Sequence, residues 1–505
     1  MMESYPMLTH ANFAEVLKFP DRLFIDGDWV APSTDARINV VSPSTEEIFI
    51  RVAQAAAADM DRAVSAARKA FDDGPWPRMS HIERAGYLRR IGQELRSRAN
   101  ELGGIWTSEM GSLYAANTQM VPGFADVYDY HAELAESFPF IEAREPAQGG
   151  TGYLVREPVG VVAAIVPWNG PLMLASWKVA PALLAGCTVI LKASPEAPGA
   201  LYALTEAAEA AGLPKGVLNL VTADREVSEL LVRDSRVDKV SFTGSTLAGR
   251  KIGAICGDRI ARCTLELGGK SPAILLDDYD IDAFAASIAG STTILTGQVC
   301  AALTRIIVSR SRHDELAEAL KARLDAVKVG DPFDARSEMG PLAMARQRDK
   351  VEYYIGMGQA EGAMLVTGGR RPSHLERGFY IEPTLFANVD NNATIAREEI
   401  FGPVLSLIPV ADETEAVRIA NESDFGLNAS VFTNDADRAF SIAREIRSGT
   451  VAQNAFRNDF TIAFGGFKQS GIGREGGTEG LRNYLETKTV LLQSPPSSMP
   501  AAVAQ

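Results

Sequence analysis

The chain has 505 residues, of which 46% are hydrophobic and 23% are charged, as in ordinary globular proteins. A chain of this length exceeds the size that one hydrophobic core supports, so we expect two or three domains. The formal net charge of −14 excludes a broad nucleic-acid-binding face, because such a face needs an excess of basic residues.

The four cysteines are too few for a disulfide framework in a chain of this length, and their spacing fits no zinc site. We therefore expect no bound metal and a reducing, cytoplasmic setting. Residues 1–20 have the pattern of neither a secretory signal nor a transit peptide. No run of about 18 apolar residues occurs, so we expect no membrane span.

The first part of the chain combines short strands with helices. Residues 22–50 predict strands, with a hairpin turn at Asp26-Gly27. Alanine, leucine, arginine and glutamate then recur with helical spacing. This spacing predicts helices near 58–71, 81–100 and 121–137.

From residue 153, apolar strands alternate with amphipathic helices. The strands are GVVAAIVP, TVILKAS, VLNLV and KVSFTG, and the helices lie near 172–186, 198–212, 226–234 and 246–257. Continuous apolar strands separated by helices predict a parallel sheet that is covered on both faces. We expect residues 158–267 to form a doubly wound core of the dinucleotide-binding type.

A second α/β segment is predicted over 268–480, with strands that include SPAILLD, RIIVSR, AMLVTGG, SLIPV and SVFT. Residues 140–157 and 483–492 indicate strands outside both main sheets, and the tail 498–505 indicates disorder. The predicted fold class is α/β, with a Rossmann-like doubly wound parallel sheet, a second α/β domain and a small β element.

Cys300, in TGQVCAAL, is the cysteine with the best case for chemistry. Cys187, Cys256 and Cys263 have the apolar surroundings of buried packing cysteines, whereas Cys300 follows Gly297-Gln298, which indicates a backbone irregularity. Packing remains the alternative for Cys300 as well. A nucleophilic thiol needs a base, and none of the five histidines stands in a motif, which argues against a Cys-His dyad and leaves a carboxylate.

Glu266, in CTLELGGKSP, is a charged residue inside an apolar strand and directly precedes two glycines. Carboxylates rarely lie in buried strands without a partner. The residue is either a strand-end glutamate that faces solvent or a general base with a shifted pKa. In the second case the glycines would let a ligand approach the backbone closely.

Two turns at the carboxyl ends of strands are candidate ligand sites, because open α/β sheets bind ligands there. PWNG at 167–170 follows the first strand of the doubly wound core, and Asn169 can either donate to an oxyanion or cap the next helix. Gly244-Ser245, with Gly249, opens a helix whose free N–H groups suit a pyrophosphate, although the middle glycine of the dinucleotide fingerprint is missing.

Together these motifs resemble the aldehyde dehydrogenase superfamily, and the resemblance runs from about residue 22 to residue 492. Seven elements occur in the family's order: PWN at 167–169, Lys192 after a strand, FTGST at 242–246, LELGGKSP at 265–272, GQVC at 297–300, EEIFGPV at 398–404 and FGGFKQSGIGRE at 464–475. The resemblance implies an enzyme that oxidises an aldehyde to a carboxylate with NAD, or NADP, as cofactor.

The resemblance also implies a role for each candidate residue. Four would carry catalysis: Cys300 as nucleophile, Asn169 with the Cys300 backbone N–H as oxyanion hole, Glu266 as the base that activates water, and Lys178 in a proton path. Eight would line the cofactor site: Trp168, Lys192, Gly244, Ser245, Gly249, Leu267, Glu399 and Phe401. Lys192 would bind the adenine ribose and Glu399 the nicotinamide ribose.

Four positions depart from the family pattern. Pro195 stands where a ribose-binding glutamate is common, with Glu196 one place later, which leaves the choice between NAD and NADP open. Leu295 replaces a frequent asparagine, Leu303 a frequent glycine and Ala463 a frequent proline. No catalytic atom is lost, but Leu295 and Leu303 can alter the loop that carries Cys300.

The resemblance places an apolar pocket for the aldehyde beside Cys300. Its expected lining residues are Gly170, Met173, Leu174, Trp177, Val299, Ala301, Phe456 and Phe460. Gly170 stands where the family often has a bulky aromatic residue, so the position either opens space for a large aldehyde or is filled by a neighbouring side chain. We expect a preference for bulky apolar aldehydes.

In the resembling family, strands outside the main sheets pair across subunits, which covers open sheet edges. We therefore expect a homodimer or homotetramer, with 138–157 and 481–497 as its oligomerisation element. The remaining division would be a dinucleotide-binding domain over 1–137 and 158–267 and a catalytic domain over 268–480.

Two alternatives remain at this point. A CoA-acylating aldehyde dehydrogenase would transfer the acyl group to a thiol, but that branch typically lacks the glutamate found here as Glu266. A non-catalytic relative with a structural or binding role would be expected to lack the nucleophile, whereas Cys300 and Asn169 are both present. The expected partners are a small aldehyde and further copies of the chain, with neither nucleic acid nor membrane.

Overall fold

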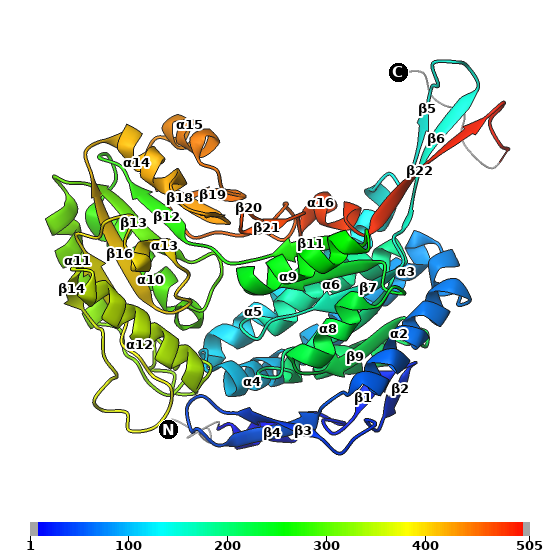
Figure 1. Cartoon of the computed structure of the whole chain (residues 1–505), viewed down its shortest axis with the longest axis horizontal. Helices are drawn as coiled ribbons and strands as arrows, with labels where there is room; N and C mark the ends of the chain where they lie inside the picture. The colour runs from blue at the N-terminus through cyan, green and yellow to red at the C-terminus, as the bar shows by residue number, and fades with distance from the viewer. Residues whose placement is uncertain (1–8, 498–505) are drawn as a thin grey trace, which may run out of the picture.

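The computed structural model describes residues 9–497, so the tail predicted to be disordered, 498–505, lies outside the described residues. Two large sheets organise the chain, and a small three-stranded sheet projects from one end (Figure 1). The α/β fold class predicted from the sequence is confirmed. No helix in the described part of the chain is long and apolar enough to cross a bilayer.

The first sheet has a parallel centre with antiparallel strands at its edges. Its eight strands run in the order β2 (Asp28–Val30), β1 (Leu23–Ile25), β9 (Leu218–Thr222), β8 (Thr188–Ala193), β7 (Val161–Ile165), β10 (Lys239–Thr243), β11 (Arg262–Glu266) and β21 (Gly471–Ile472). The order reverses between β7 and β10, so the connections that leave these two strands diverge.

Helices cover both faces of this sheet. On β7, Val161, Ala163 and Ile165 pack into one core, whereas Val162 and Ala164 pack into another. The first core includes residues of α2 (Ala57–Asp72), α8 (Arg225–Arg233) and α9 (Thr246–Asp258). The second includes residues of α3 (His81–Ser97), α4 (Ala99–Met110), α5 (Tyr114–Ser137), α6 (Pro171–Ala185) and α7 (Gly199–Ala210). This explains why β7 is apolar throughout rather than alternating.

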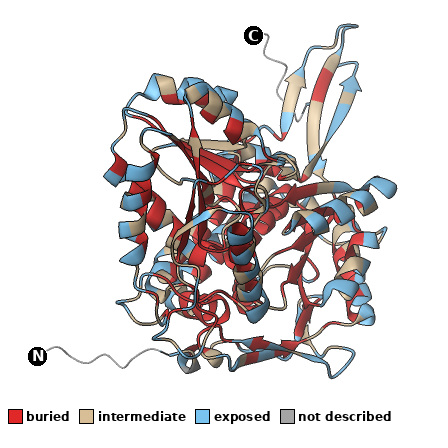
Figure 2. Cartoon of the chain, turned by 60° about the vertical axis from the view of Figure 1, so that its left-hand side comes forward, coloured by how far each residue is buried: buried red, intermediate tan, exposed pale blue. Residues whose placement is uncertain are grey.

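The second sheet is parallel except for its edge strand β14. Its order is β14 (Met364–Thr367), β15 (Thr384–Ala387), β16 (Val404–Val410), β13 (Leu303–Ser309), β12 (Ser271–Leu275), β18 (Asn428–Phe432) and β19 (Thr450–Gln453). One face packs on α10 (Ile281–Thr293) and α11 (His313–Asp325), and the other on α12 (Ala345–Ala360), α13 (Thr394–Arg397), α14 (Glu413–Asn421) and α15 (Ala436–Glu445). Figure 2 shows buried strands enclosed by helices with exposed outer faces.

The third sheet consists of β22 (Leu485–Leu492), β6 (Thr151–Pro158) and β5 (Ile141–Arg144). It joins residues far apart in the chain through antiparallel pairing, with Leu485 opposite Pro158. Short elements complete the fold: α1 (Ala11–Ala14), β3 (Arg37–Val41) paired with β4 (Ile48–Ala53), β17 (Phe425–Gly426) paired with β20 (Phe467–Lys468), and α16 (Gly477–Arg482).

Most predicted elements occur close to their expected positions, and the Asp26-Gly27 turn joins β1 to β2 with both residues at positive φ. Two helix boundaries were wrong. The helix predicted over 81–100 ends at Ser97, and a separate helix follows over Ala99–Met110. The helix predicted from 121 begins at Tyr114, because its interior tolerates Pro122 while it packs on α3 and α4.

Candidate active site

The reversal of strand order places two loops at the same edge of the first sheet. Pro167, Trp168 and Asn169 follow β7, and Gly244 and Ser245 follow β10. Between them lies a cavity of about 180 Å³. Its lining residues are Pro167, Trp168, Asn169, Thr243, Gly244, Ser245, Leu267, Cys300, Gln347, Lys350, Glu399 and Phe401. A crevice at such a reversal is where open α/β sheets bind their ligands.

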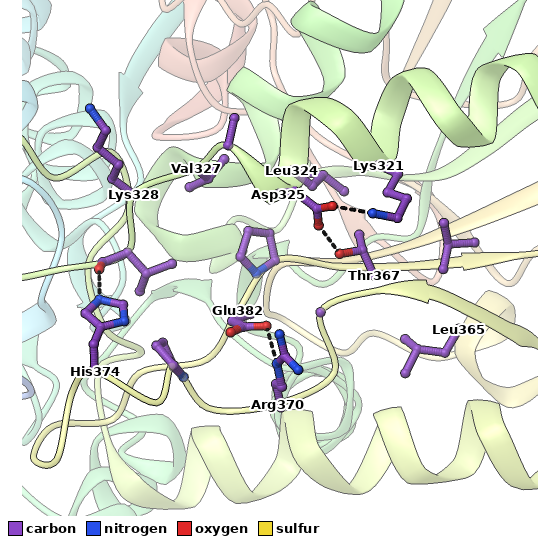
Figure 3. Close-up of a pocket in the computed structure, with 16 residues that line it drawn as sticks. Lys321, Leu324, Asp325, Val327, Lys328, Leu365, Thr367, Arg370, His374 and Glu382 are labelled. Carbon is purple, nitrogen blue, oxygen red and sulfur yellow. Dashed lines mark hydrogen bonds and ion pairs between the residues drawn. The ribbon is translucent and has the colours of Figure 1, made fainter.

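A larger cavity, of about 730 Å³, lies at the end of α11 beside β14 (Figure 3). Its carboxylates are already paired: Asp325 accepts from Lys321 and Thr367, and Glu382 accepts from Arg370 at 3.0 Å. None of its lining residues is a cysteine. Size alone therefore does not identify the reactive site. The smaller cavity is the better candidate, because Cys300, Asn169 and Glu399 line it.

The loop before Cys300 is held in an uncommon backbone conformation. Leu295 and Thr296 adopt left-handed angles, with φ of 48° and 56°. Gly297 is also left-handed, and a Cβ there would lie 2.4 Å from the backbone of Gly402. Left-handed leucine is costly, whereas asparagine tolerates this region. The departure at Leu295 thus puts strain into the loop that presents the thiol.

Asn169 ties this loop to the first sheet. The side-chain Nδ2 of Asn169 donates to the backbone carbonyl of Gln298 at 3.0 Å. The backbone carbonyl of Asn169 accepts from Trp106 Nε1 at 3.1 Å. The second N–H of the amide has no hydrogen-bond partner among the described residues. Asn169 and Cys300 line the same cavity, so this amide can offer a donor beside the sulfur.

Electrostatics keep the Cys300 thiol protonated. Burial raises the pKa of Cys300 to about 12, and the carboxylates of Glu399 and Glu266 raise it in the same direction. At neutral pH the thiolate fraction is therefore small. Reaction at this sulfur requires a proton acceptor or a positive charge close by.

Glu266 ends β11 and lies 98% buried, so the alternative of a solvent-facing glutamate is wrong. Neither of its carboxylate oxygens has a hydrogen-bond partner among the described residues. Burial raises the pKa of Glu266 well above its usual range, and the charge of Glu475 raises it further, while Lys178 and Arg474 oppose the rise. A buried carboxyl of this kind is suited to proton transfer near neutral pH.

Lys178, on α6, is fully buried. Its Nζ donates to Thr243 Oγ1 at 2.6 Å and forms an ion pair with Glu475. Glu475 was missed at the sequence level, although it ends the motif FGGFKQSGIGRE. Its backbone exchanges two hydrogen bonds with Phe464, of 2.6 and 2.7 Å, which fix it opposite Lys178.

The remaining cofactor candidates surround the cavity or lie beyond it. Phe401 has a positive φ of 63°, and its ring meets that of Trp168 edge to face at 5.4 Å. Glu399 accepts from the Gly269 N–H at 3.1 Å, and a Cβ on Gly268 would lie 2.5 Å from its carboxylate. The glycines after Glu266 thus make room for a second carboxylate.

Gln347 and Lys350 also line the cavity and had no signal in the sequence motifs, because they lie on α12. Gln347 donates to the Phe401 carbonyl at 2.7 Å, and Lys350 donates to the Glu399 carbonyl at 2.9 Å. These two side chains therefore hold the EEIFGPV segment against the cavity.

Lys192 lies at the end of β8 and does not line the cavity itself. Burial lowers its pKa to about 8, against the charges of Glu196 and Asp224. Its ammonium forms no hydrogen bond or ion pair with the described residues. Glu196 accepts from Ser194 and Arg346.

Ser245 caps α9 by accepting from the Ala248 N–H at 3.3 Å. Gly249 lets this helix approach β11, since a Cβ there would lie 2.4 Å from Leu267 Cδ2. Gly249 is therefore a packing position behind the cavity, whereas Gly244, Ser245 and Leu267 line it.

The predicted aldehyde-pocket residues share one hydrophobic core with Cys300. Leu174, Trp177 and Ala301 are buried in it, and Met173, Val299, Phe456 and Phe460 are partly buried against it. At Gly170, a Cβ would meet the Met173 methyl at 3.5 Å. A flexible neighbour thus occupies part of the space that a larger residue would take. None of the eight predicted residues is among those that line the 180 Å³ cavity.

Comparison with known proteins adds the decisive observation. The family model described as "Aldehyde dehydrogenase family" matches residues 29–490. The chain belongs to the aldehyde dehydrogenase family. It is therefore an oxidoreductase that acts on aldehydes, as the sequence predicted.

Similar proteins cover nearly all of the chain. A geranial dehydrogenase from Castellaniella defragrans is 43% identical over 471 residues, which are 93% of this chain and 98% of that protein. The crystal structure of a Mycobacterium tuberculosis aldehyde dehydrogenase complexed with NAD+ is 44% identical, with a TM-score of 0.92 over 95% of this chain and 99% of that one. A mutant of aldehyde dehydrogenase C from Pseudomonas syringae, complexed with NAD+ and octanal, is 38% identical, with a TM-score of 0.91 over 98% and 99%.

The thiols of this dehydrogenase should differ in reactivity before any cofactor binds. The neighbouring Cys256 thiol lowers the pKa of Cys263, and Lys239 acts in the same direction. At pH 7, iodoacetamide should therefore label the partly exposed Cys263 before Cys300. Labelling of Cys300 should accelerate roughly tenfold per pH unit from pH 8 to 10, because its thiolate fraction rises in that proportion.

Peptide mapping by mass spectrometry measures both rates in the native protein. Cys187, which is fully buried, is the internal control and should stay unlabelled until the protein is denatured. Faster labelling of Cys300 than of Cys263 at pH 7 would contradict the electrostatics described above.

Proposed function

We propose that this chain oxidises bulky apolar aldehydes to carboxylates with NAD, through a thioester on Cys300 that water hydrolyses. The observation that carries the proposal is the shared cavity, in which the thiol, the Asn169 amide and a cradle for a cofactor meet. The buried, unpartnered carboxylate of Glu266 near this cavity favours hydrolysis over transfer to a second thiol.

In the first step, the Cys300 sulfur bonds to the aldehyde carbon as its thiol proton passes to solvent water, and the carbonyl oxygen becomes an oxyanion. The free N–H of Asn169 and the Cys300 backbone N–H would stabilise this charge. One such donor contributes roughly 10²–10³-fold to the rate. The hydrogen bond from Asn169 to the Gln298 carbonyl holds the amide in place, so no reorganisation is needed when the charge appears.

The residues present fit NAD. Lys192 is a buried ammonium without a partner among the described residues, which ribose hydroxyls would satisfy, and Glu399 would hold the second ribose. Ser245 and Trp168 would meet the pyrophosphate at the start of α9, with Phe401 beside the nicotinamide. When bound, NAD supplies the hydride acceptor and a positive charge close to the thiol. The carboxylate of Glu196 near Lys192 supports NAD over NADP, since it would repel a 2′-phosphate.

In the last step, Glu266 takes a proton from water as the water oxygen attacks the thioester carbon, and the Cys300 sulfur departs as the acid forms. A base with a raised pKa is charged only above that pKa, so this step should fail as the pH falls. Lys178 and Glu475 form the buried ion pair next to Glu266 that can take the proton onward.

The aldehyde class follows from the walls of the predicted pocket, which are apolar and aromatic. Trp177 and Phe464 pack edge to face at 5.2 Å, and Phe460 lies 6.0 Å from Tyr130. A fixed cation for a second carboxylate is absent among the predicted lining residues, although Arg457 lies close in sequence. One similar protein is named for geranial, and the similar aldehyde dehydrogenase C was crystallised with octanal; both compounds are apolar aldehydes, which supports the same class here.

The proposed domain division assigns 1–137 and 158–267 to cofactor binding, 268–480 to catalysis, and 138–157 with 481–497 to oligomerisation. The projecting sheet supports the last assignment (Figure 1). Its strands expose Ile141, Leu491 and Leu492, with 43, 68 and 38% of their surface accessible. Apolar residues on an open sheet edge favour pairing with another chain.

Glu266→Gln should separate the two halves of the reaction. Loss of the base should slow thioester hydrolysis by about 10²–10⁴-fold while the first turnover survives. Rapid mixing with NAD and aldehyde should then give a burst of NADH followed by a slow phase. Cys300→Ala should abolish turnover without a burst, and Cys256→Ala should retain near-parental turnover. Hydrolysis at the parental rate in Glu266→Gln would exclude Glu266 as the base.

The aldehyde preference can be ranked by kcat/KM for acetaldehyde, hexanal, benzaldehyde, citral and succinic semialdehyde. We expect citral, benzaldehyde and hexanal to exceed the other two, because an apolar pocket gains about 1–3 kcal/mol per buried methylene. Met173→Ala should improve the largest aldehyde most, since it frees the space beside Gly170. First place for acetaldehyde or succinic semialdehyde would overturn the proposed class.

Light scattering tests the oligomeric state. We expect a dimer or tetramer at micromolar concentration, and a shift toward smaller species when Leu491 and Leu492 are both changed to lysine, because charge on the exposed edge opposes pairing. A stable 54.2 kDa species for the unmodified chain would refute the oligomer.

A further inference from the structure

A pair of buried hydroxyl groups continues the charged cluster of the active site away from the cavity. Tyr484 OH donates to Ser241 Oγ at 3.1 Å, and Ser241 Oγ donates to Glu475 Oε1 through a long hydrogen bond of 3.5 Å. Ser241 is fully buried on β10, and Tyr484, between α16 and β22, has 2% of its surface exposed. Neither residue is among those that line the cavity.

Glu475 has few other donors. Lys178 is the only other side chain among the described residues that donates to it, and the second oxygen, Oε2, has no hydrogen-bond partner there. The charge of Glu475 is one cause of the raised pKa of Glu266. Whatever stabilises the ionised form of Glu475 therefore acts on Glu266 as well.

The direction of the two hydroxyl bonds is fixed by chemistry. Burial and the charge of Glu475 raise the pKa of Tyr484 well above its usual range, so its hydroxyl keeps its proton and donates it to Ser241. Ser241 then directs its own single proton toward Glu475, and both dipoles point their positive ends at the carboxylate. Such an arrangement holds the carboxylate in one position by charge-assisted hydrogen bonding.

The backbone of Tyr484 is clamped, which keeps its hydroxyl in place. Its carbonyl accepts from the Val159 N–H at 2.9 Å and from Cys187 Sγ at 3.4 Å. The Lys239 ammonium lies 5.2 Å from the centre of its ring and donates to Thr264 Oγ1 at 2.6 Å. The charged and titratable groups around Glu475 are thus Lys178, Glu266, Arg474, Tyr484 and Lys239, with Cys187 behind Tyr484.

We propose that Tyr484 and Ser241 are positioning residues that hold the Glu475 carboxylate in place and thereby set the pH at which Glu266 can act as the base. The proposal rests on the proposed role of Glu266 in thioester hydrolysis. Tyr484 directly precedes β22 and lies outside the proposed substrate and cofactor sites. The proposal nevertheless gives it an influence on thioester hydrolysis.

The sign of the effect follows from the charges. Without the Ser241 donor, Lys178 is the one side chain among the described residues that still donates to Glu475. Pairing with Lys178 alone offsets more of the Glu475 charge, so less of that charge acts on Glu266 and the pKa of Glu266 falls. In the pH profile of thioester hydrolysis, the acid limb is the range in which the rate falls as the pH is lowered. This limb should move to lower pH in Tyr484→Phe and in Ser241→Ala, by about 0.5 pH unit or more.

The experiment follows the acyl-enzyme directly. The full-length protein is mixed with NAD and hexanal at pH values from 5.5 to 9, quenched with acid, and its acyl-enzyme is measured by intact-protein mass spectrometry. Ser241→Thr keeps the hydroxyl and should restore the parental profile. Tyr202→Phe is the matched control, because Tyr202 is also buried and donates one hydrogen bond, to the Arg22 carbonyl at 3.0 Å.

The expected result is a shifted acid limb in Tyr484→Phe and Ser241→Ala, with an unchanged NADH burst and parental profiles for Ser241→Thr and Tyr202→Phe. An unshifted limb, or a shift to higher pH, would overturn the proposal. Glu266→Gln separates this failure from failure of the proposed function, since a variant that keeps the parental limb without Glu266 would show that Glu266 is not the base. Far-ultraviolet circular dichroism and thermal melting confirm that each variant is folded.

Discussion

The reversal of strand order between β7 and β10 is the constraint on which the rest of the site depends. Parallel strands end at one edge of a sheet, and the connections that follow β7 and β10 leave toward opposite sides. The gap between them receives PWNG from one loop and the start of α9 from the other. The second sheet only has to bring Cys300 and Glu399 to this gap, which it does through the loop before β13 and the segment before β16.

The site gathers charged groups in surroundings that disfavour charge. Burial raises the pKa of Cys300 to about 12 and lowers that of Lys192 to about 8, and it raises the pKa of Glu266 as well. Each shift moves a group toward its neutral form, which is the general effect of removing water. Because little water screens these groups, a charge that binds nearby acts strongly on them. Binding of a charged cofactor can therefore change their protonation.

Backbone geometry contributes separately from electrostatics. The left-handed residues before Cys300 and at Phe401 lie on facing segments, and Gly297 packs directly on the backbone of Gly402. A close approach of two backbones needs glycine on one side. Three hydrogen bonds of Gln298 maintain the strain at Leu295. They join Gln298 to Asn169, Leu295 and Ala343 and so fix the loop.

The amino-acid sequence by itself determined the α/β class, the run of strands and helices, and the residues of the motifs, because apolar periodicity and glycine placement are local properties. It also predicted that Cys300, Asn169 and Glu266 belong to one site, through the resemblance of ordered motifs. It could not determine the helix boundary at Tyr114 or the choice of solvent or interior for Glu266, since both depend on packing against distant segments. Gln347, Lys350, Glu475 and the pair formed by Ser241 and Tyr484 became visible only in the tertiary structure. Their side chains come from separate elements, and a hydrogen bond between residues 243 positions apart leaves no periodic signal in a single sequence.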